Sequence, residues 1–162
     1  MTNSALEEAT KNGNILPTTK SNCESFLSLE KMPQWAKDSI QELIENESWT
    51  ELNDRFFKDI TLGTGGMRGR TIGKVITKEE QGGTREGITP KHAAIGTNTL
   101  NEITILRATK ALYTYTTHYM ATAGILEQPR LVVAHDVRHF SCDFSKLVAM
   151  AWQKMGGFAM IF

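Results

Sequence analysis

The sequence contains no long apolar run and little cysteine. No segment approaches the roughly 18 consecutive apolar residues of a membrane-spanning helix, so no membrane partner is expected. The N-terminal stretch, with Glu7 and Glu8, lacks the apolar core of a signal peptide. The two cysteines, Cys23 and Cys142, lie far apart and match no metal-ligand spacing. These absences predict a cytoplasmic protein with reduced thiols, and a disulfide between the two cysteines is the alternative.

Charge is balanced over the whole chain but uneven along it. The net charge is zero at pH 7, with 18 basic and 18 acidic residues. Residues 1–60 carry six Lys/Arg against eleven Asp/Glu, whereas residues 64–92 carry six against three. The local positive field over 64–92 favours a small anion. Because that stretch contains no Phe, Tyr or Trp on which bases would stack, nucleic acid is not expected as a partner.

The positive charge surrounds a glycine-rich motif, Gly63-Thr64-Gly65-Gly66-Met67-Arg68-Gly69-Arg70. Glycine lets backbone N–H groups approach a ligand, and the planar guanidinium group of arginine suits phosphate oxygens. The motif therefore predicts a phosphate-binding loop, with a solvated glycine turn as the alternative. It is not a dinucleotide fingerprint, because Arg68 stands where the third glycine belongs. It also lacks the Gly-Lys-Ser/Thr ending of a nucleotide P-loop.

The pattern before this motif predicts a lead-in and then helices. Residues 1–32 form a flexible N-terminal lead-in on this prediction, because their first part is polar and aperiodic. A helical extension is expected over 33–57. There Pro33 opens the first helix, and Ser48 forms a capping box with Glu51 at the start of the second. The long irregular stretch that follows is typical of a functional or mobile segment.

Beyond residue 100 the sequence shows alternating helix and strand signals. A helix is expected from Asn101, its N-cap, to Gly124. A short apolar strand over 130–134 precedes a helix that Ser141 caps, and a second apolar strand follows over 158–162. Strand, helix and strand in this order predict a parallel βαβ unit with a right-handed crossover, and hence an α/β fold.

The loop from His135 to Ser141 follows the first of these strands, at the sheet edge where α/β proteins bind ligands. Asp136 and two histidines have only a loose metal-ligand spacing, so a metal site is not favoured. Arg138 has two interpretations, as an anion ligand or as the salt-bridge partner of Asp136. Their nearness in the sequence favours the salt bridge.

Three separated segments together resemble one enzyme family. Asp59 to Gly69 is similar to the opening loop of the α-D-phosphohexomutases, the phosphoglucomutase/phosphomannomutase family. Gly96-Thr97-Asn98-Thr99-Leu100-Asn101, with Arg107-Ala108-Thr109 in the next helix, resembles the following motif of those enzymes. Leu131 to Phe162 resembles their second strand, loop, helix and third strand. The order and spacing agree over about residues 50–162.

The resemblance implies that residues 58–162 are domain I of such an enzyme, a three-layer α/β/α domain with a mixed, largely parallel sheet. Enzymes of this family are isomerases of carbohydrate metabolism. As intramolecular phosphotransferases, they move a phosphoryl group between C1 and C6 of a hexose phosphate through a phosphoserine and a hexose bisphosphate. The residues implied to bind the phosphorylated hexose are Thr64, Gly65, Gly66, Arg68 and Arg138. Arg70 is expected to point outward.

The sequence also departs from the family. It lacks the phosphoserine loop and the Asp-Gly-Asp-type Mg²⁺ loop, residues 77–95 look like an insertion, and His135 replaces a common tyrosine. We therefore expect a fragment truncated before the catalytic serine and inactive alone, with the Mg²⁺ ligands in the full-length protein. A non-catalytic α/β module that binds phosphosugars or other anions is the alternative. The sequence does not select among glucose, mannose and pentose phosphates, nor among oligomeric states.

Overall fold

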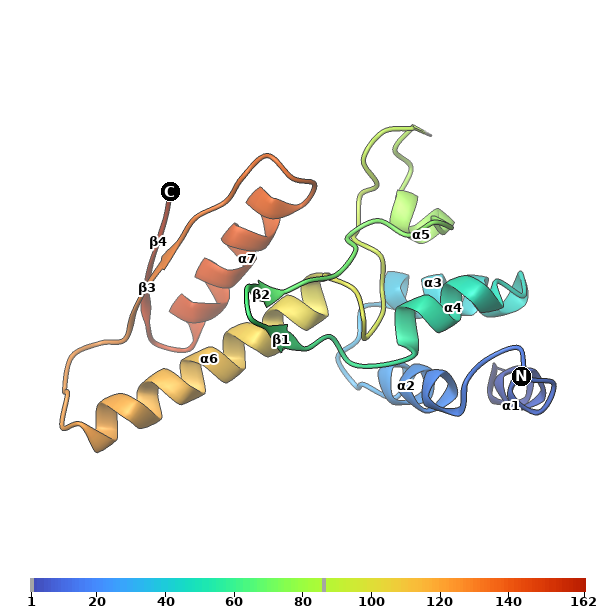
Figure 1. Cartoon of the computed structure of the whole chain (residues 1–162). Coiled ribbons are helices and arrows are strands. Elements are labelled where there is room, and N and C mark those ends of the chain that lie inside the picture. The colour runs from blue at the N-terminus through green and yellow to red at the C-terminus, as the bar shows by residue number, and fades with distance from the viewer. Residues whose placement is uncertain (1, 86) are drawn as a thin grey trace. The chain divides into compact units, whose positions relative to one another are not determined.

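The computed structural model describes residues 2–85 and 87–162, and it contains both helices and strands (Figure 1). The chain divides into two compact units, the first ending at Asn101 and the second beginning at Glu102. In the described residues, the strands form one antiparallel pair in unit 1 and one parallel pair in unit 2. The mixed helix–strand class expected from the sequence is therefore confirmed at this level.

Unit 1 is mainly helical. Its elements are α1 (Thr2–Lys11), α2 (Pro17–Leu27), α3 (Gln34–Glu45), α4 (Trp49–Phe56), β1 (Leu62–Gly63), β2 (Gly66–Met67) and α5 (Lys78–Gln81). The first four helices pack on one another, and α5 packs on α3. As expected, α3 begins directly after Pro33, whose fixed φ suits a helix start.

The N-terminal residues differ from the flexible lead-in that the sequence predicts, because α1 and α2 occupy most of them. Leu6 and Cys23 are fully buried, and Phe26 contacts Phe56 of α4 edge to face, with ring centroids 5.7 Å apart. Burial raises the pKa of the Cys23 thiol, which is therefore a protonated core residue. A few well-spaced apolar side chains suffice to dock these helices, although their outer faces are polar.

Helix capping also differs from the expected pattern. Ser48 precedes α4, but its side chain makes no capping hydrogen bond. A capping box instead opens α5, where the Glu80 backbone N–H donates to Thr77 Oγ1 (3.3 Å) and the Thr77 N–H donates to Glu80 Oε2 (3.2 Å). Glu51 does not complete a box at Ser48, because its carboxylate binds Arg55 inside the unit.

Unit 2 consists of a long helix followed by a βαβ unit. Its elements are α6 (Glu102–Thr122), β3 (Arg130–Val133), α7 (Ser141–Lys154) and β4 (Phe158–Ile161). β3 and β4 are parallel, with Leu131 opposite Ala159, so the βαβ unit expected from the sequence is confirmed. α6 packs beside α7 (Figure 1). Although α6 has 21 residues, no helix in the described ranges is long and apolar enough to cross a membrane.

Trp152 is the centre of the small core of unit 2. It is 1% exposed, contacts Tyr113 of α6 edge to face at 5.0 Å, and donates from Nε1 to the Pro129 carbonyl at 3.1 Å. Gly157 passes so close that a Cβ there would lie 2.3 Å from Trp152 Nε1. The indole thus joins α6, α7 and the entry to β3, which fixes the βαβ unit.

Candidate functional site

The glycine-rich motif forms a short hairpin in unit 1. Leu62 pairs with Met67, and Gly63 with Gly66, across β1 and β2. Thr64 and Gly65 lie at the turn between the strands and are exposed. Gly66 has φ +97°, a conformation that residues with a Cβ rarely adopt. The hairpin therefore presents a hydroxyl group and bare backbone at its tip.

Arg68 returns over this tip. A Cβ on Gly65 would lie 2.6 Å from Arg68 Nη2, so the guanidinium group lies directly against the backbone of the turn. Arg68 is exposed, and its guanidinium group makes no hydrogen bond or ion pair with any other residue that the structure describes. An uncompensated guanidinium beside a hydroxyl and bare backbone is an arrangement that suits a small anion.

The base of the hairpin is attached to the segment before α6. The Ile60 N–H donates to the Thr97 carbonyl (2.7 Å), and the Leu100 N–H donates to the Arg70 carbonyl (2.9 Å). Gly69 passes close to this segment, because a Cβ there would lie 3.2 Å from the Asn98 carbonyl oxygen and 3.3 Å from the Leu100 nitrogen. The first two of the three segments that bear the family resemblance therefore contact each other.

Arg70, expected to point outward, instead turns toward α4. Its Nη2 forms an ion pair with Asp54 and lies 3.6 Å from Glu51 Oε2. Its Nη1 is buried and has no hydrogen-bond partner among the described residues. Two nearby carboxylates compensate the charge of Arg70, whereas that of Arg68 stays available for a ligand.

A buried ion network continues from Glu51 into the core of unit 1. Glu51 Oε1 accepts hydrogen bonds from Arg55 Nε (2.7 Å) and from the Lys74 N–H (3.2 Å). Arg55 Nη1 lies 2.5 Å from Glu80 Oε1. Burial alone would lower the pKa of Arg55, but the two carboxylates outweigh it and raise that pKa. Arg55 is therefore charged and paired, although it is fully buried.

Glu80 joins the described part of the segment 77–95 to the core of unit 1. Besides Arg55, its carboxylate accepts hydrogen bonds from Ser39 Oγ and from the Ile95 N–H, both at 3.0 Å. The segment expected to be an insertion thus supplies Glu80, one of the two buried carboxylates that compensate the charge of Arg55.

Arg138 lies in unit 2, on the loop after β3, and pairs with Asp136. Both Nε and Nη2 lie 2.8 Å from Asp136 Oδ2, so the salt bridge favoured by the sequence is confirmed. Hydrogen bonds from Arg138 lower the pKa of Asp136 to about 2. The hairpin belongs to the other unit, so its described geometry contains the other four predicted site residues but not Arg138.

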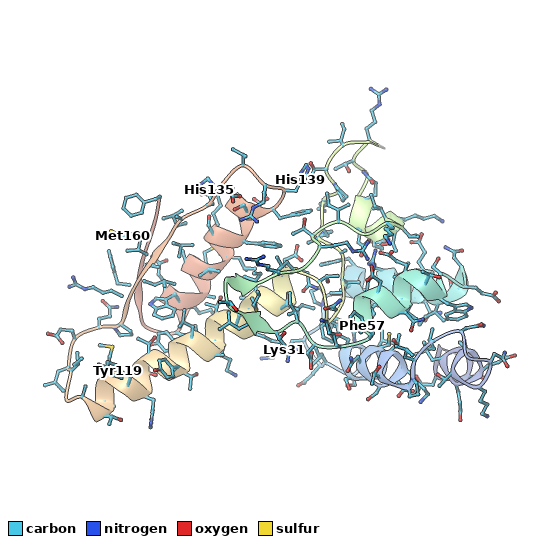
Figure 2. The ribbon with its side chains drawn as sticks, in the orientation of Figure 1. Lys31, Phe57, Tyr119, His135, His139 and Met160 are labelled. Atoms are coloured by element: carbon cyan, nitrogen blue, oxygen red, sulfur yellow. The ribbon has the colours of Figure 1, made fainter. Side chains whose placement is uncertain are left out.

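The rest of that loop differs from the sequence expectation at Ser141. Its hydroxyl accepts a hydrogen bond from the Asp136 N–H (3.1 Å), and α7 starts after Phe140, which has φ +65°, without a side-chain cap. His135 and His139 lie on the same loop (Figure 2). Across residues 2–85 and 87–162, no group of three or more His, Cys, Asp or Glu side chains could hold a metal ion.

Sequence reasoning missed the carboxylates that organise the hairpin's surroundings. No functional motif of the sequence includes Asp54 or Glu80. Two short patterns indicate part of the network. The first is the i,i+4 spacing of Glu51 and Arg55, which is typical of a helical ion pair. Thr77 and Glu80 have the spacing of a capping box. Neither pattern indicates that Glu80 reaches Arg55, because that contact joins separate elements.

Comparisons with known proteins add no relative. No protein-family model matches the chain, and neither a curated protein nor a solved structure does. The functional interpretation therefore depends on the chemistry of the hairpin and on the resemblance of the three sequence segments.

Proposed function

We propose that the hairpin binds the phosphate group of a phosphorylated hexose, as part of domain I of a cytoplasmic phosphohexomutase-like isomerase. One observation above all supports this proposal. The guanidinium group of Arg68 lies against Gly65 at an exposed tip and has no partner among the described residues. A cation that the fold leaves uncompensated, beside bare backbone, is suited to an anionic ligand.

Each hairpin residue has a defined task in this proposal. Arg68 supplies positive charge and planar donors to phosphate oxygens, where a preorganised cation stabilises a transferring phosphoryl group. Thr64 donates its hydroxyl hydrogen. Gly65 and Gly66 let the backbone approach the ligand, since a side chain at Gly65 would push the Arg68 guanidinium group away from the turn. Arg138 would take part only if it left Asp136, and we assign it no contact.

The parent reaction needs parts that this chain does not supply. None of its residues matches the family's phosphoserine loop. The described residues do not fit the Mg²⁺ site either, because no three suitable ligands gather and Asp54 pairs with Arg70. We therefore propose that the chain alone binds phosphosugar without turnover. In this proposal β3, α7 and β4 are part of the three-layer α/β/α domain I, with β3 and β4 in its mixed, largely parallel sheet.

Calorimetric titration with glucose 1-phosphate tests the proposal. Replacing Arg68→Gln removes the hairpin cation that has no partner among the described residues, and a hydrogen bond to a charged group is worth about 1.5–3 kcal/mol. We expect affinity to fall by about tenfold or more. Arg85→Gln, an exposed arginine outside the hairpin, is the matched control and should bind as the wild type does. Equal affinity of wild type and Arg68→Gln would refute the phosphate site, as would no binding by the wild type.

A further inference from the structure

The returning arm of the hairpin, residues 66–70, is attached to α4 by Arg70. The Arg70 side chain reaches Asp54 and Glu51 of α4, while its carbonyl accepts from the Leu100 N–H at 2.9 Å. Arg70 thus contacts two separate parts of unit 1, and it stands two residues after Arg68. Its position controls where the returning arm leaves the hairpin.

Behind Arg70 the contacts continue as a chain of alternating charge. The order is Asp54, Arg70, Glu51, Arg55 and Glu80, so each cation lies between two carboxylates. The inner members are almost fully buried, with Glu51 at 4%, Arg55 at 0% and Glu80 at 1% exposure. Buried pairs have few alternative partners, because leaving them would strand a charge away from water. Glu51 is therefore a rigid anchor for Arg70.

We propose that Arg70 is a positioning residue for the anion site: it clamps the hairpin on α4 and so holds Arg68 over the tip. Two carboxylates compensate its own charge, so the anion interacts with Arg68. The role in ligand binding rests on the proposed function, whereas the clamp itself can be tested without any ligand.

Hydrogen exchange of the hairpin amides tests the clamp. Arg70→Gln removes the charge that reaches α4, so the amides of residues 63–68 should exchange several-fold faster than in the wild type. Asp54→Asn should have a smaller effect, because Glu51 still lies 3.6 Å from Nη2. Arg70→Lys keeps the charge and should partly restore protection. Arg85→Gln is the control, and urea unfolding of each variant verifies that unit 1 remains folded.

Titration with inorganic phosphate at low and high salt then separates positioning from direct binding. A positioning role predicts that Arg70→Gln weakens phosphate binding by about three- to tenfold while the dependence on salt stays that of the wild type, because Arg68 is still the interacting cation. If Arg70 contacted phosphate directly, phosphate binding by Arg70→Gln would depend less on salt than binding by the wild type, as we expect for Arg68→Gln. Arg70→Gln behaving like Arg68→Gln would therefore overturn the positioning role.

The two proposals fail in different ways. Unchanged hairpin exchange in folded Arg70→Gln would overturn the clamp, whatever the wild type binds. A wild type that binds no phosphate would overturn the proposed function and, with it, the positioning of an anion ligand. Faster exchange in Arg70→Gln would then still support the clamp as a structural contact.

Discussion

At Arg55 a full positive charge lies in the protein core, where an unpaired ion would be very costly. The carboxylates of Glu51 and Glu80 accept hydrogen bonds from all three of its guanidinium nitrogens. Nη2 also donates to the Val75 carbonyl at 2.6 Å. A buried ion network of this kind contributes little net stability when it is intact, but removing one partner destabilises the fold strongly. The fold of unit 1 therefore depends on keeping the buried charge of Arg55 paired.

The substitution Glu80→Gln should destabilise unit 1 strongly. It leaves the buried Arg55 charge short of one carboxylate, and breaking such a buried pair costs about 3–5 kcal/mol. Urea unfolding measures the loss. Glu79→Gln is the matched control, because Glu79 is an exposed neighbour in the same helix and surface changes stay within about 0.5 kcal/mol. Similar unfolding free energies for the two variants would contradict the structural role of Glu80.

Asp136 should titrate unusually low. Hydrogen bonds from Arg138 lower its pKa from 3.8 to about 2, so the stabilisation that they give is complete above pH 3.8. It is lost as the pH falls through about 2, because the carboxyl group then takes up a proton in the folded state. An NMR titration of the Asp136 carboxyl carbon measures this midpoint. Arg138→Gln should raise the midpoint and Arg130→Gln should not; a wild-type midpoint near 3.8 would argue against the pair.

At the scale of elements, the hairpin is stabilised by its base rather than by its own ladder. Two residues in each strand form too short a pairing to be stable alone. Hydrogen bonds from Ile60 and Leu100, together with the Arg70 ion pair, hold its two arms. The tip between them can therefore remain exposed and bare, which is what a ligand-binding turn requires.

The turn itself should depend on Gly66. Nothing lies within 4 Å of a Cβ at this position, so Gly66→Ala is costly only because φ is +97°. A penalty on the order of 1 kcal/mol is expected, which corresponds to about fivefold faster hydrogen exchange in the hairpin. Gly63→Ala is the control, because its Cβ would meet the Gly66 carbonyl oxygen at an ordinary 3.7 Å. Equal exchange in both variants would count against the strained turn.

At the scale of the whole molecule, the parallel sheet of unit 2 has one uncovered apolar face. Leu131 of β3 packs against the core around Trp152. On the opposite face, Val132 is 56% exposed, Phe158 44% and Met160 47%. Figure 2 shows Met160 on β4. Parallel sheets in α/β proteins are normally covered on both faces, so this one is a hydrophobic patch on the chain as it stands.

This patch should cause concentration-dependent self-association near pH 7, where the chain has no net charge to oppose it. Met160→Lys places a charge in the middle of the uncovered face and should shift sedimentation toward the monomer. Val137→Lys adds the same charge on the fully exposed loop after β3 and should leave association unchanged. If both lysines act equally, net charge rather than the sheet face controls association.

Much of unit 2 and the tip of the hairpin could be predicted from local sequence. The sequence predicts the bounds of β3, α7 and β4 closely, because the apolar periodicity and the glycines that indicate them are short-range signals. The role of Arg70 could not be predicted, because its partners lie on α4, about one helix turn apart and far from it in sequence. The N-terminal helices could not be predicted for a related reason, because their few apolar residues stabilise a helix only when the helices pack together.

The sequence by itself determined the chemistry of the candidate site: four glycines, a threonine and two arginines in eight residues, in a locally positive segment. The family resemblance sets Arg68 apart from an outward Arg70, but only the tertiary structure shows what each arginine contacts. Arg70 meets the carboxylates of α4 and is compensated, whereas Arg68 lies over bare glycine backbone and has no counter-charge in the part of the chain that the structure describes. Ion pairing depends on distance in space, and the spacing of residues along a loop does not specify which charges meet.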